Sequence, residues 1–485
     1  MGITSFYFLV FYGIVLILYY VLPKRWQWGV LLIASIFYYL CSGNAILILY
    51  PLLAVAVSFA GIYWMTKAQE EEALLKERGK DVAKRRKAAL LFVIFANVAV
   101  LFLLKYINFG IHTINAAASF FGAGRDILSG FNWLVPLGIS YYSLSLIGYV
   151  VDVYFGIAVP QKNPAKLALY GMFFPVMVSG PILRYREDGE QFFEPHLFDY
   201  KQVTQGMQRM LWGFFKELVI SERMALIVNT IYGNYEAYPG VYIWIGTVAF
   251  AFQLYTNFSG GMDIVLGLAQ TFGLKLPENF RRPFFSKNIS EYWRRWHISL
   301  SSWFRDYVYI PLGGSRVSKI KHIRNLLIVW FLTGLWHGAA WNFVAWGLYY
   351  GVILIIEKYL LSPVLDRLPD IVRHIYSIVL VVIGWVLFFS SSFGQAADYI
   401  RVMFGAGAHG FADRESMYLL TSNLILWLIL IFGSTPLVHF RYEHMLRTKK
   451  WNTTIINSVV YAALFIVCIA YLVTETYNPF LYFRF

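Results

Sequence analysis

Two histidines in this chain are candidates for acid–base chemistry. His337 lies in the apolar stretch FLTGLWHGAAWNF (331–343), and His297 lies forty positions earlier in EYWRRWHISLSSWFRDY (291–307). Imidazole changes its charge near neutral pH, so it suits a general base that removes the proton of a hydroxyl group. The pair is therefore compatible with acyl transfer to an alcohol. His337 would be the base, and His297 would hold the thioester end or orient that base.

Each histidine also has a structural interpretation. His337 can be a neutral ring that is hydrogen-bonded between membrane helices. His297 can have a purely structural role in an amphipathic helix at the membrane interface. Small residues on both sides of His337 leave space for a pocket that Trp336 and Trp341 would line. The same small residues also permit plain close packing of helices.

The segment around His297 has a helical pattern. Its large apolar residues recur three or four positions apart from Trp293 to Tyr307, which predicts one amphipathic helix. His297 would lie on a neighbouring face of this helix. Arg294 and Arg295 add positive charge beside it, so both are candidates for substrate binding.

The composition indicates an integral membrane protein. The chain has 485 residues, of which 59% are hydrophobic and only 14% are charged, whereas soluble domains average about 25% charged residues. Apolar runs of nearly the length that spans a bilayer recur along the whole sequence, which predicts about eleven to thirteen membrane-embedded helices. We expect an all-α, polytopic fold that forms a single domain over residues 1–485.

A further group of polar side chains interrupts an apolar run at 252–273. Asn257, Ser259 and Asp263 lie in it, and Gly260 and Gly261 are expected to break the helix. Broken membrane helices often mark a binding site, because their freed backbone groups need partners. The alternative is a kinked helix whose polar groups are satisfied locally. Arg184, which follows the Gly180–Pro181 interruption, is another candidate for substrate binding.

The distribution of charge predicts the orientation. The net charge is +14. Two loops are rich in basic residues, Lys67–Lys87 and the loop with the Lys24–Arg25 pair, and the positive-inside rule places both on the cytoplasmic side. The N-terminus is then outside, and Asn108–Gly130 is an external loop. No cleavable signal is expected at the N-terminus.

A second basic segment extends from Arg281 to Arg324, with ten Lys and Arg residues against Glu291 and Asp306. It can anchor the protein against anionic lipid. It can also dock an anionic cytosolic donor, such as a coenzyme A thioester or an acidic carrier protein. Nucleic acid is not an expected partner. The sequence has no zinc-binding or phosphate-loop motif, so a mechanism with no bound cofactor or metal is expected.

Five segments, taken in order, resemble the bacterial membrane-bound O-acyltransferase (MBOAT) family, with the alginate O-acetyltransferase type as the nearest branch. They are FPVMVSGPILRY, NFSGGMDIVLGLAQTFG, LPENFRRPF, WRRWHISLSSWFRDYVYIPLGG and GLWHGAAWNFVAWGLYYG. The resemblance covers about residues 136–351, the motif-bearing core. The family often has Asp where Asn257 stands, so no required charge is assigned to that position.

The resemblance implies helices around a central pore in the plasma membrane. It maps the essential histidine to His337 and a second histidine to His297. An acyl group, in the first instance acetyl, would pass from a cytosolic thioester to a hydroxyl outside. The acceptor would be a cell-envelope polysaccharide or an extracytoplasmic SGNH-type partner. Two rivals remain: D-alanyl transfer to teichoic acids from an acidic carrier protein, and a proton-coupled transporter that uses the histidines as a relay.

Overall fold

The computed structural model describes residues 1–75, 79–122, 127–435 and 451–474. Every regular element in these ranges is a helix, which confirms the predicted all-α class. By its internal contacts the chain divides into two compact units. The first comprises Met1–Met207 with Val265–Pro277, and the second comprises Gln208–Ile264 with Glu278–Phe485. The single domain expected over residues 1–485 stays a prediction.

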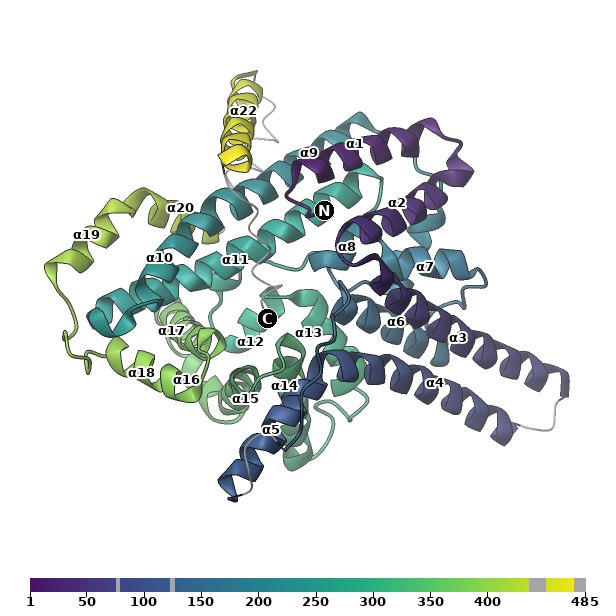
Figure 1. Ribbon diagram of the computed structural model, residues 1–485, viewed down its shortest axis with the longest axis horizontal. Helices are drawn as coiled ribbons and strands as arrows, with labels where there is room; N and C mark the ends of the chain where they lie inside the picture. Colours follow the sequence, from purple (N-terminus) through teal and green to yellow (C-terminus); the bar gives the residue numbers. More distant parts are fainter. Residues whose placement is uncertain (76–78, 123–126, 436–450, 475–485) are drawn as a thin grey trace. The chain divides into compact units, whose positions relative to one another are not determined.

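Figure 1 shows the helices in chain order. The first unit contains α1 (Phe6–Val21), α2 (Gln27–Cys41), α3 (Leu49–Leu75), α4 (Gly79–Leu101), α5 (Ile107–Phe120), α6 (Ile139–Tyr154), α7 (Pro164–Met172) and α8 (Phe174–Ser179). The second contains α10 (Glu222–Tyr232), α12 (Ile289–Arg295), α13 (Ile298–Phe304), α14 (Lys319–His337), α15 (Trp341–Ile356), α16 (Ser362–Leu365), α17 (Asp370–Phe389), α18 (Phe393–Met403), α19 (Arg414–Ser422), α20 (Leu424–Ser434) and α22 (Trp451–Thr474). Two helices, α9 (Tyr200–Phe214) and α11 (Gly240–Thr271), contribute residues to both units.

Several of these helices can cross a membrane, which supports the predicted polytopic class. Five described helical stretches are long and apolar enough: Ala45–Glu71, Asp81–Phe120, Trp341–Leu365, Asp370–Phe389 and Ile455–Val473. A sixth is added if α19 and α20, which meet at 64°, form one span. The larger predicted number of eleven to thirteen includes shorter apolar helices such as α1. That number and the central pore stay predictions.

Two segments expected as loops are largely helical. In the basic segment 67–87, α3 continues to Leu75 and α4 begins at Gly79, and the two helices lie side by side as a hairpin (Figure 1). Opposite charges face each other across it, with Arg85 Nη1 2.9 Å from Glu71 Oε2. The expected external loop at 108–130 also begins as helix, because α5 extends to Phe120. The distribution of charge predicts where a membrane span leaves the bilayer, but it does not predict where the helix ends.

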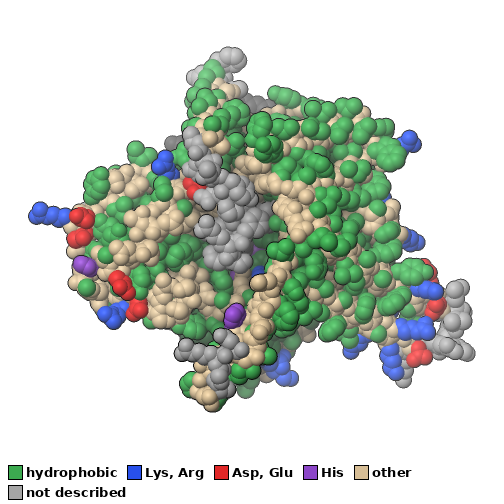
Figure 2. Space-filling view, in the orientation of Figure 1, with side chains coloured by type: hydrophobic (Ala, Val, Ile, Leu, Met, Phe, Trp, Pro, Cys, Tyr) green, Lys and Arg blue, Asp and Glu red, His purple; other side chains and the backbone are tan. Residues whose placement is uncertain are grey.

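The surface agrees with a lipid environment. Figure 2 shows many hydrophobic side chains on the face drawn, while Lys, Arg, Asp and Glu side chains lie mainly at the edges of the view, including the end of the α3–α4 hairpin. Large apolar side chains are exposed on these helices; Phe95, for example, has 74% of its surface accessible and Ile33 has 70%. Soluble monomers rarely expose such large apolar patches, so these helices form the surface of a membrane protein.

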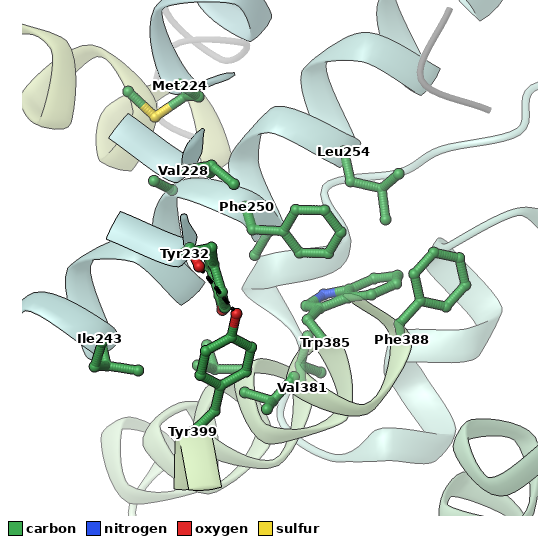
Figure 3. Packing of buried hydrophobic residues seen from close by; sticks show 14 of the residues in the cluster. Met224, Val228, Tyr232, Ile243, Phe250, Leu254, Val381, Trp385, Phe388 and Tyr399 are labelled. Carbon is green, nitrogen blue, oxygen red and sulfur yellow. Dashed lines mark hydrogen bonds between the residues drawn. The ribbon is translucent and has the colours of Figure 1, made fainter. Parts of the chain in front are cut away.

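The second unit is built around an aromatic core (Figure 3). The Tyr232 and Tyr399 rings are 4.7 Å apart, and the Tyr399 hydroxyl donates to the Tyr232 carbonyl oxygen. Trp385 and Phe388 on α17 extend this core, with ring centroids 5.3 Å apart. Large rings bury much apolar area with few rotatable bonds. The core therefore fixes α17, whose Phe388 also contacts the candidate site.

Candidate active site

His297 lies at a break between two short helices. α12 ends at Arg295 and α13 begins at Ile298, with His297 in the left-handed conformation at φ 45°. A side chain in this region costs about 1 kcal/mol or more, so the surrounding contacts must hold it. The single amphipathic helix predicted from Trp293 to Tyr307 is wrong, because the left-handed residue interrupts it and a π-helical turn follows α13 at Arg305.

His337 is the last residue of α14, where the chain turns into α15. The two helices approach closely at Gly334 and Gly347. A Cβ added to Gly334 would lie 2.3 Å from the Phe343 carbonyl oxygen, and one added to Gly347 would lie 2.2 Å from the Trp330 carbonyl oxygen. Only glycine permits this backbone contact. The small residues that suggested space around His337 therefore serve helix packing as well.

The structure brings the two histidines together although they are forty positions apart. Their ring centroids are 6.4 Å apart, and the rings are inclined at 66°. Trp336 contacts both, with centroids 5.6 Å from His297 and 5.0 Å from His337. His297 is 1% exposed and His337 is 4% exposed. The two imidazoles thus share one buried, low-polarity site.

Aromatic rings enclose this pair. Phe258 lies 4.9 Å from the His297 ring, while Trp346 and Phe388 lie 4.9 and 5.8 Å from the His337 ring. These side chains come from α11, α15 and α17, so several helices of the second unit position the site. A water-poor enclosure strengthens any interaction with charge that develops during a reaction.

Burial controls the protonation of His297. Desolvation lowers the pKa of its imidazole from 6.5 to about 3, because the charged ring loses hydration and gains no carboxylate partner. The ring is therefore neutral at pH 7. A neutral imidazole keeps a lone pair and can accept a proton or a hydrogen bond.

This pKa predicts acid lability. Between pH 6.5 and 3 the unfolded chain binds a proton at His297 that the folded protein does not bind. Lowering the pH in this range therefore favours unfolding, by up to about 1.4 kcal/mol per pH unit. We expect the thermal midpoint of the parent in detergent to fall more between pH 6.5 and 5 than that of His297→Gln. Parallel curves for the two proteins would contradict this assignment.

The polar group on α11 is placed differently from expectation. α11 continues as one helix through Gly260 and Gly261, so the predicted break is wrong. The reason is again close packing, since a Cβ on Gly213 would lie 2.6 Å from the Gly260 carbonyl oxygen. Asn257 and Ser259 are buried at 5% and 3% exposure. Within the described residues, Asn257 Oδ1 has no hydrogen-bond partner.

Asp263 is committed to ion pairs. Its carboxylate lies 2.5 Å from Lys216 Nζ and 3.0 Å from Arg209 Nε, and Arg209 also binds Glu278 at 2.7 Å. The Lys216 ammonium is 3.5 Å from Ser259 Oγ as well. A carboxylate balanced in this way is a structural anchor between α9, α11 and the LPENF segment. A role in substrate binding for Asn257, Ser259 and Asp263 stays a prediction.

The remaining candidates are more scattered. Arg295 pairs with Glu291 one helical turn away, Arg294 is exposed, and Trp341 is 50% exposed at the start of α15. Arg184 is buried in the first unit, where its backbone N–H donates to Asp188 Oδ2 at 3.0 Å. The roles proposed for these four residues stay predictions.

Sequence reasoning missed Asn279. This residue is fully buried in the LPENF segment, and its side-chain oxygen lies 3.2 Å from His297 Nδ1. The LPENF motif is part of the family resemblance, but nothing in the sequence pairs its asparagine with a residue eighteen positions later. In the described residues no group of three or more His, Cys, Asp or Glu side chains could hold a metal ion.

Comparison with known proteins identifies the family of this chain. Residues 161–393, which include both histidines and Asn279, match the model of MBOAT, the membrane-bound O-acyltransferase family. The chain is 32% identical over 505 residues to the probable alginate O-acetylase AlgI of Pseudomonas putida, covering 99% of each protein. The chain belongs to the membrane-bound O-acyltransferase family. It is therefore an enzyme, an O-acyltransferase, and a multi-pass membrane protein.

Other relatives are named for different acyl groups or different acceptors. The peptidoglycan O-acetyltransferase of Helicobacter pylori is 28% identical over 412 residues, covering 79% of this chain and 74% of that protein. The teichoic acid D-alanyltransferase of Bacillus subtilis is 31% identical over 243 residues, covering 46% of this chain and 59% of that protein. The family membership thus leaves the acyl group and the acceptor to be argued separately.

Proposed function

We propose that this enzyme transfers an acetyl group from a cytosolic thioester to a hydroxyl of an extracytoplasmic polysaccharide or of a partner protein. The observation that carries the proposal is the buried pair of imidazoles, 6.4 Å apart, in one aromatic enclosure. Similarity over 99% of the length of an alginate O-acetylase supports acetyl as the acyl group. The reaction needs no bound cofactor or metal beyond its thioester donor.

In the proposed reaction, His337 removes the proton of the acceptor hydroxyl. The acceptor oxygen attacks the carbonyl carbon of the thioester, the new C–O bond forms, and the C–S bond breaks. The thiolate leaves and takes the proton from the histidine, so charge and protons balance. A positioned base of this kind contributes about 100- to 10,000-fold to a rate. His297 assists by contacting the thioester end or by orienting His337.

The donor is proposed to dock on the basic segment 281–324. Arg281, Arg294, Arg305, Arg316 and Lys319 are exposed there. Exposed guanidinium and ammonium groups suit the phosphates of coenzyme A or an acidic carrier protein. The same charges also suit anionic lipid, and the two roles are compatible. We place this segment on the cytoplasmic side of the plasma membrane, with the N-terminus outside.

The acceptor is proposed to be outside the cell. The relatives described above are named for alginate, peptidoglycan and teichoic acid. An extracytoplasmic SGNH-type partner would be one route by which the acyl group reaches such a polymer, and direct transfer would be the other. D-alanyl transfer from a carrier protein is the second candidate, favoured by the match to the teichoic acid D-alanyltransferase.

A choice of donors tests this proposal. Purified protein in nanodiscs would be given labelled acetyl-coenzyme A, an acetyl carrier thioester or a D-alanyl carrier thioester, together with a soluble polysaccharide acceptor. We expect acetyl-coenzyme A to give an ester-bound label on the acceptor. Label from D-alanyl carrier alone would move the assignment to the second candidate. In sealed vesicles that contain the same protein, solute uptake driven by a pH gradient, with no acyl product from any donor, would support a proton-coupled transporter instead.

A further inference from the structure

Asn279 is bound to the turn that carries His297 through three contacts. Its backbone carbonyl oxygen accepts from the Ile298 N–H at 3.0 Å. Its side-chain oxygen accepts from the Ser299 N–H at 2.9 Å and lies 3.2 Å from His297 Nδ1. Two residues later, the Arg281 N–H donates to the Arg295 carbonyl oxygen at 2.9 Å. The LPENF segment thus holds the left-handed turn between α12 and α13 in place.

The Ser299 contact fixes which way the Asn279 amide points. A backbone N–H can only donate, so the atom 2.9 Å from it must be the amide oxygen. The amide nitrogen then faces Met262 Sδ at 3.4 Å, a weak acceptor that suits an N–H donor. The orientation of this side chain is therefore set by the Ser299 N–H, and the Met262 contact is compatible with it.

The same oxygen determines the tautomer of His297. Asn279 Oδ1 cannot donate, so His297 Nδ1 must carry the hydrogen that bridges the 3.2 Å contact. In a neutral ring the second nitrogen, Nε2, then has a lone pair and no hydrogen. Within the described residues, His297 Nε2 is buried with no hydrogen-bond partner.

We propose that Asn279 is a positioning residue that holds His297 in the Nδ1–H tautomer and so makes Nε2 an accepting atom in the site. This inference rests on the proposed function, and it decides between the two roles left open for His297. Holding the thioester carbonyl oxygen needs a donor, which the neutral Nε2 does not provide. Accepting a hydrogen bond or proton, and thereby orienting His337 or the acceptor hydroxyl, is the role that this tautomer permits.

The neighbours of His297 support an accepting role. The rings nearest to it belong to Phe258, Trp336 and His337. Burial keeps the imidazole neutral at pH 7. The hydrogen that Nε2 accepts during reaction then comes from His337, from the indole N–H of Trp336 or from a substrate hydroxyl. Asn279 is fully buried beneath His297 Nδ1, so it acts through the histidine.

The tautomer is measured directly by nitrogen-15 NMR on histidine-labelled protein in detergent, with the His297 signals assigned by their loss in His297→Gln. We expect a protonated-type Nδ1 and a lone-pair-type Nε2 in the parent. The reverse pattern would overturn the inference whether or not the protein transfers acyl groups. This readout does not depend on activity, so a failure of the proposed function is distinguishable from a failure of the inference.

Two variants test the positioning role against a merely structural one. Asn279→Asp keeps an acceptor for Ser299 and His297 and adds a negative charge, which raises the pKa of an adjacent imidazole. We expect this variant to retain transfer at pH 7 within about tenfold of the parent. Its His297 should titrate at least one pH unit higher by NMR. Asn279→Leu loses the acceptor, and we expect its rate to fall about 100-fold.

Met262→Leu is the matched control, because it removes only the contact to the amide nitrogen, and its rate should be unchanged. Gel filtration would confirm folding of each variant. If Asn279→Leu does not fold, Asn279→Asp decides alone. An unshifted His297 titration in Asn279→Asp, or transfer by folded Asn279→Leu within threefold of the parent, would overturn the proposal.

Discussion

Replacing His337 with alanine is expected to lower acyl transfer by about 1,000-fold while the protein stays folded. The imidazole is the proposed base, and alanine removes the group that takes the proton of the acceptor hydroxyl. Other contacts in the aromatic enclosure remain, because Trp336, Trp346 and Phe388 are unchanged. The initial rate of ester formation from acetyl-coenzyme A measures the effect.

His322 offers a matched control on the same helix, α14. It is buried at 2% exposure, and its two ring nitrogens lie 2.7 and 2.6 Å from the Tyr309 and Tyr359 hydroxyls. Both nitrogens are thus engaged in structural hydrogen bonds. We expect His322→Gln to reduce stability slightly and to leave the transfer rate near that of the parent. A rate loss in His322→Gln as large as that in His337→Ala would remove the special role of His337.

The second large effect is expected from Gly347→Ala. The new methyl group would lie 2.2 Å from the Trp330 carbonyl oxygen and 3.0 Å from Gly334 Cα, and neither backbone atom can move alone. α14 and α15 must separate, which we expect to cost about 3 kcal/mol of unfolding free energy. The neighbouring Trp346 contacts His337 at 4.9 Å, so transfer should also fall about tenfold. Thermal unfolding in detergent and the transfer rate of the folded fraction measure the two effects.

Gly13→Ala controls for the loss of a helical glycine. Gly13 lies in α1, and no described atom outside its own helix lies within 4 Å of an added Cβ. Alanine favours a helix by about 1 kcal/mol over glycine, so this variant should be neutral or slightly more stable. A Gly347→Ala protein as stable as Gly13→Ala would show that the two helices do not need their close approach.

The sequence was sufficient to predict the fold class, and it drew attention to two histidines whose catalytic roles stay predictions. The composition and the apolar runs predicted an all-helical membrane protein, because lipid allows few other structures. The sequence singled out His337 and His297 as candidates but left open whether they meet, and the structure places their rings in one enclosure. Chemistry-bearing residues in apolar segments are costly, and this makes them conspicuous in a sequence.

Helix boundaries, and contacts between residues far apart in the chain, could not be predicted from the sequence. The apolar stripe predicted one helix through His297, but the backbone bonds from Asn279 and Arg281 favour a break that no local propensity reveals. Conversely, Gly260 and Gly261 suggested a break in α11, but α11 is continuous. The backbone at Gly260 is in close contact with Gly213, so a glycine is needed there for packing. In both cases tertiary contacts overrode the local pattern, and only a structure places those contacts.

The most direct test of the account is acyl transfer across a bilayer. Sealed vesicles containing the parent or His337→Ala would receive labelled acetyl-coenzyme A on the side of the basic segment 281–324. Alginate or peptidoglycan, with any secreted partner, would be on the other side. The account predicts that label becomes ester-bound to the polymer with the parent and not with folded His337→Ala. Equal transfer by both proteins, or label that acylates only acceptors on the donor side, would contradict it.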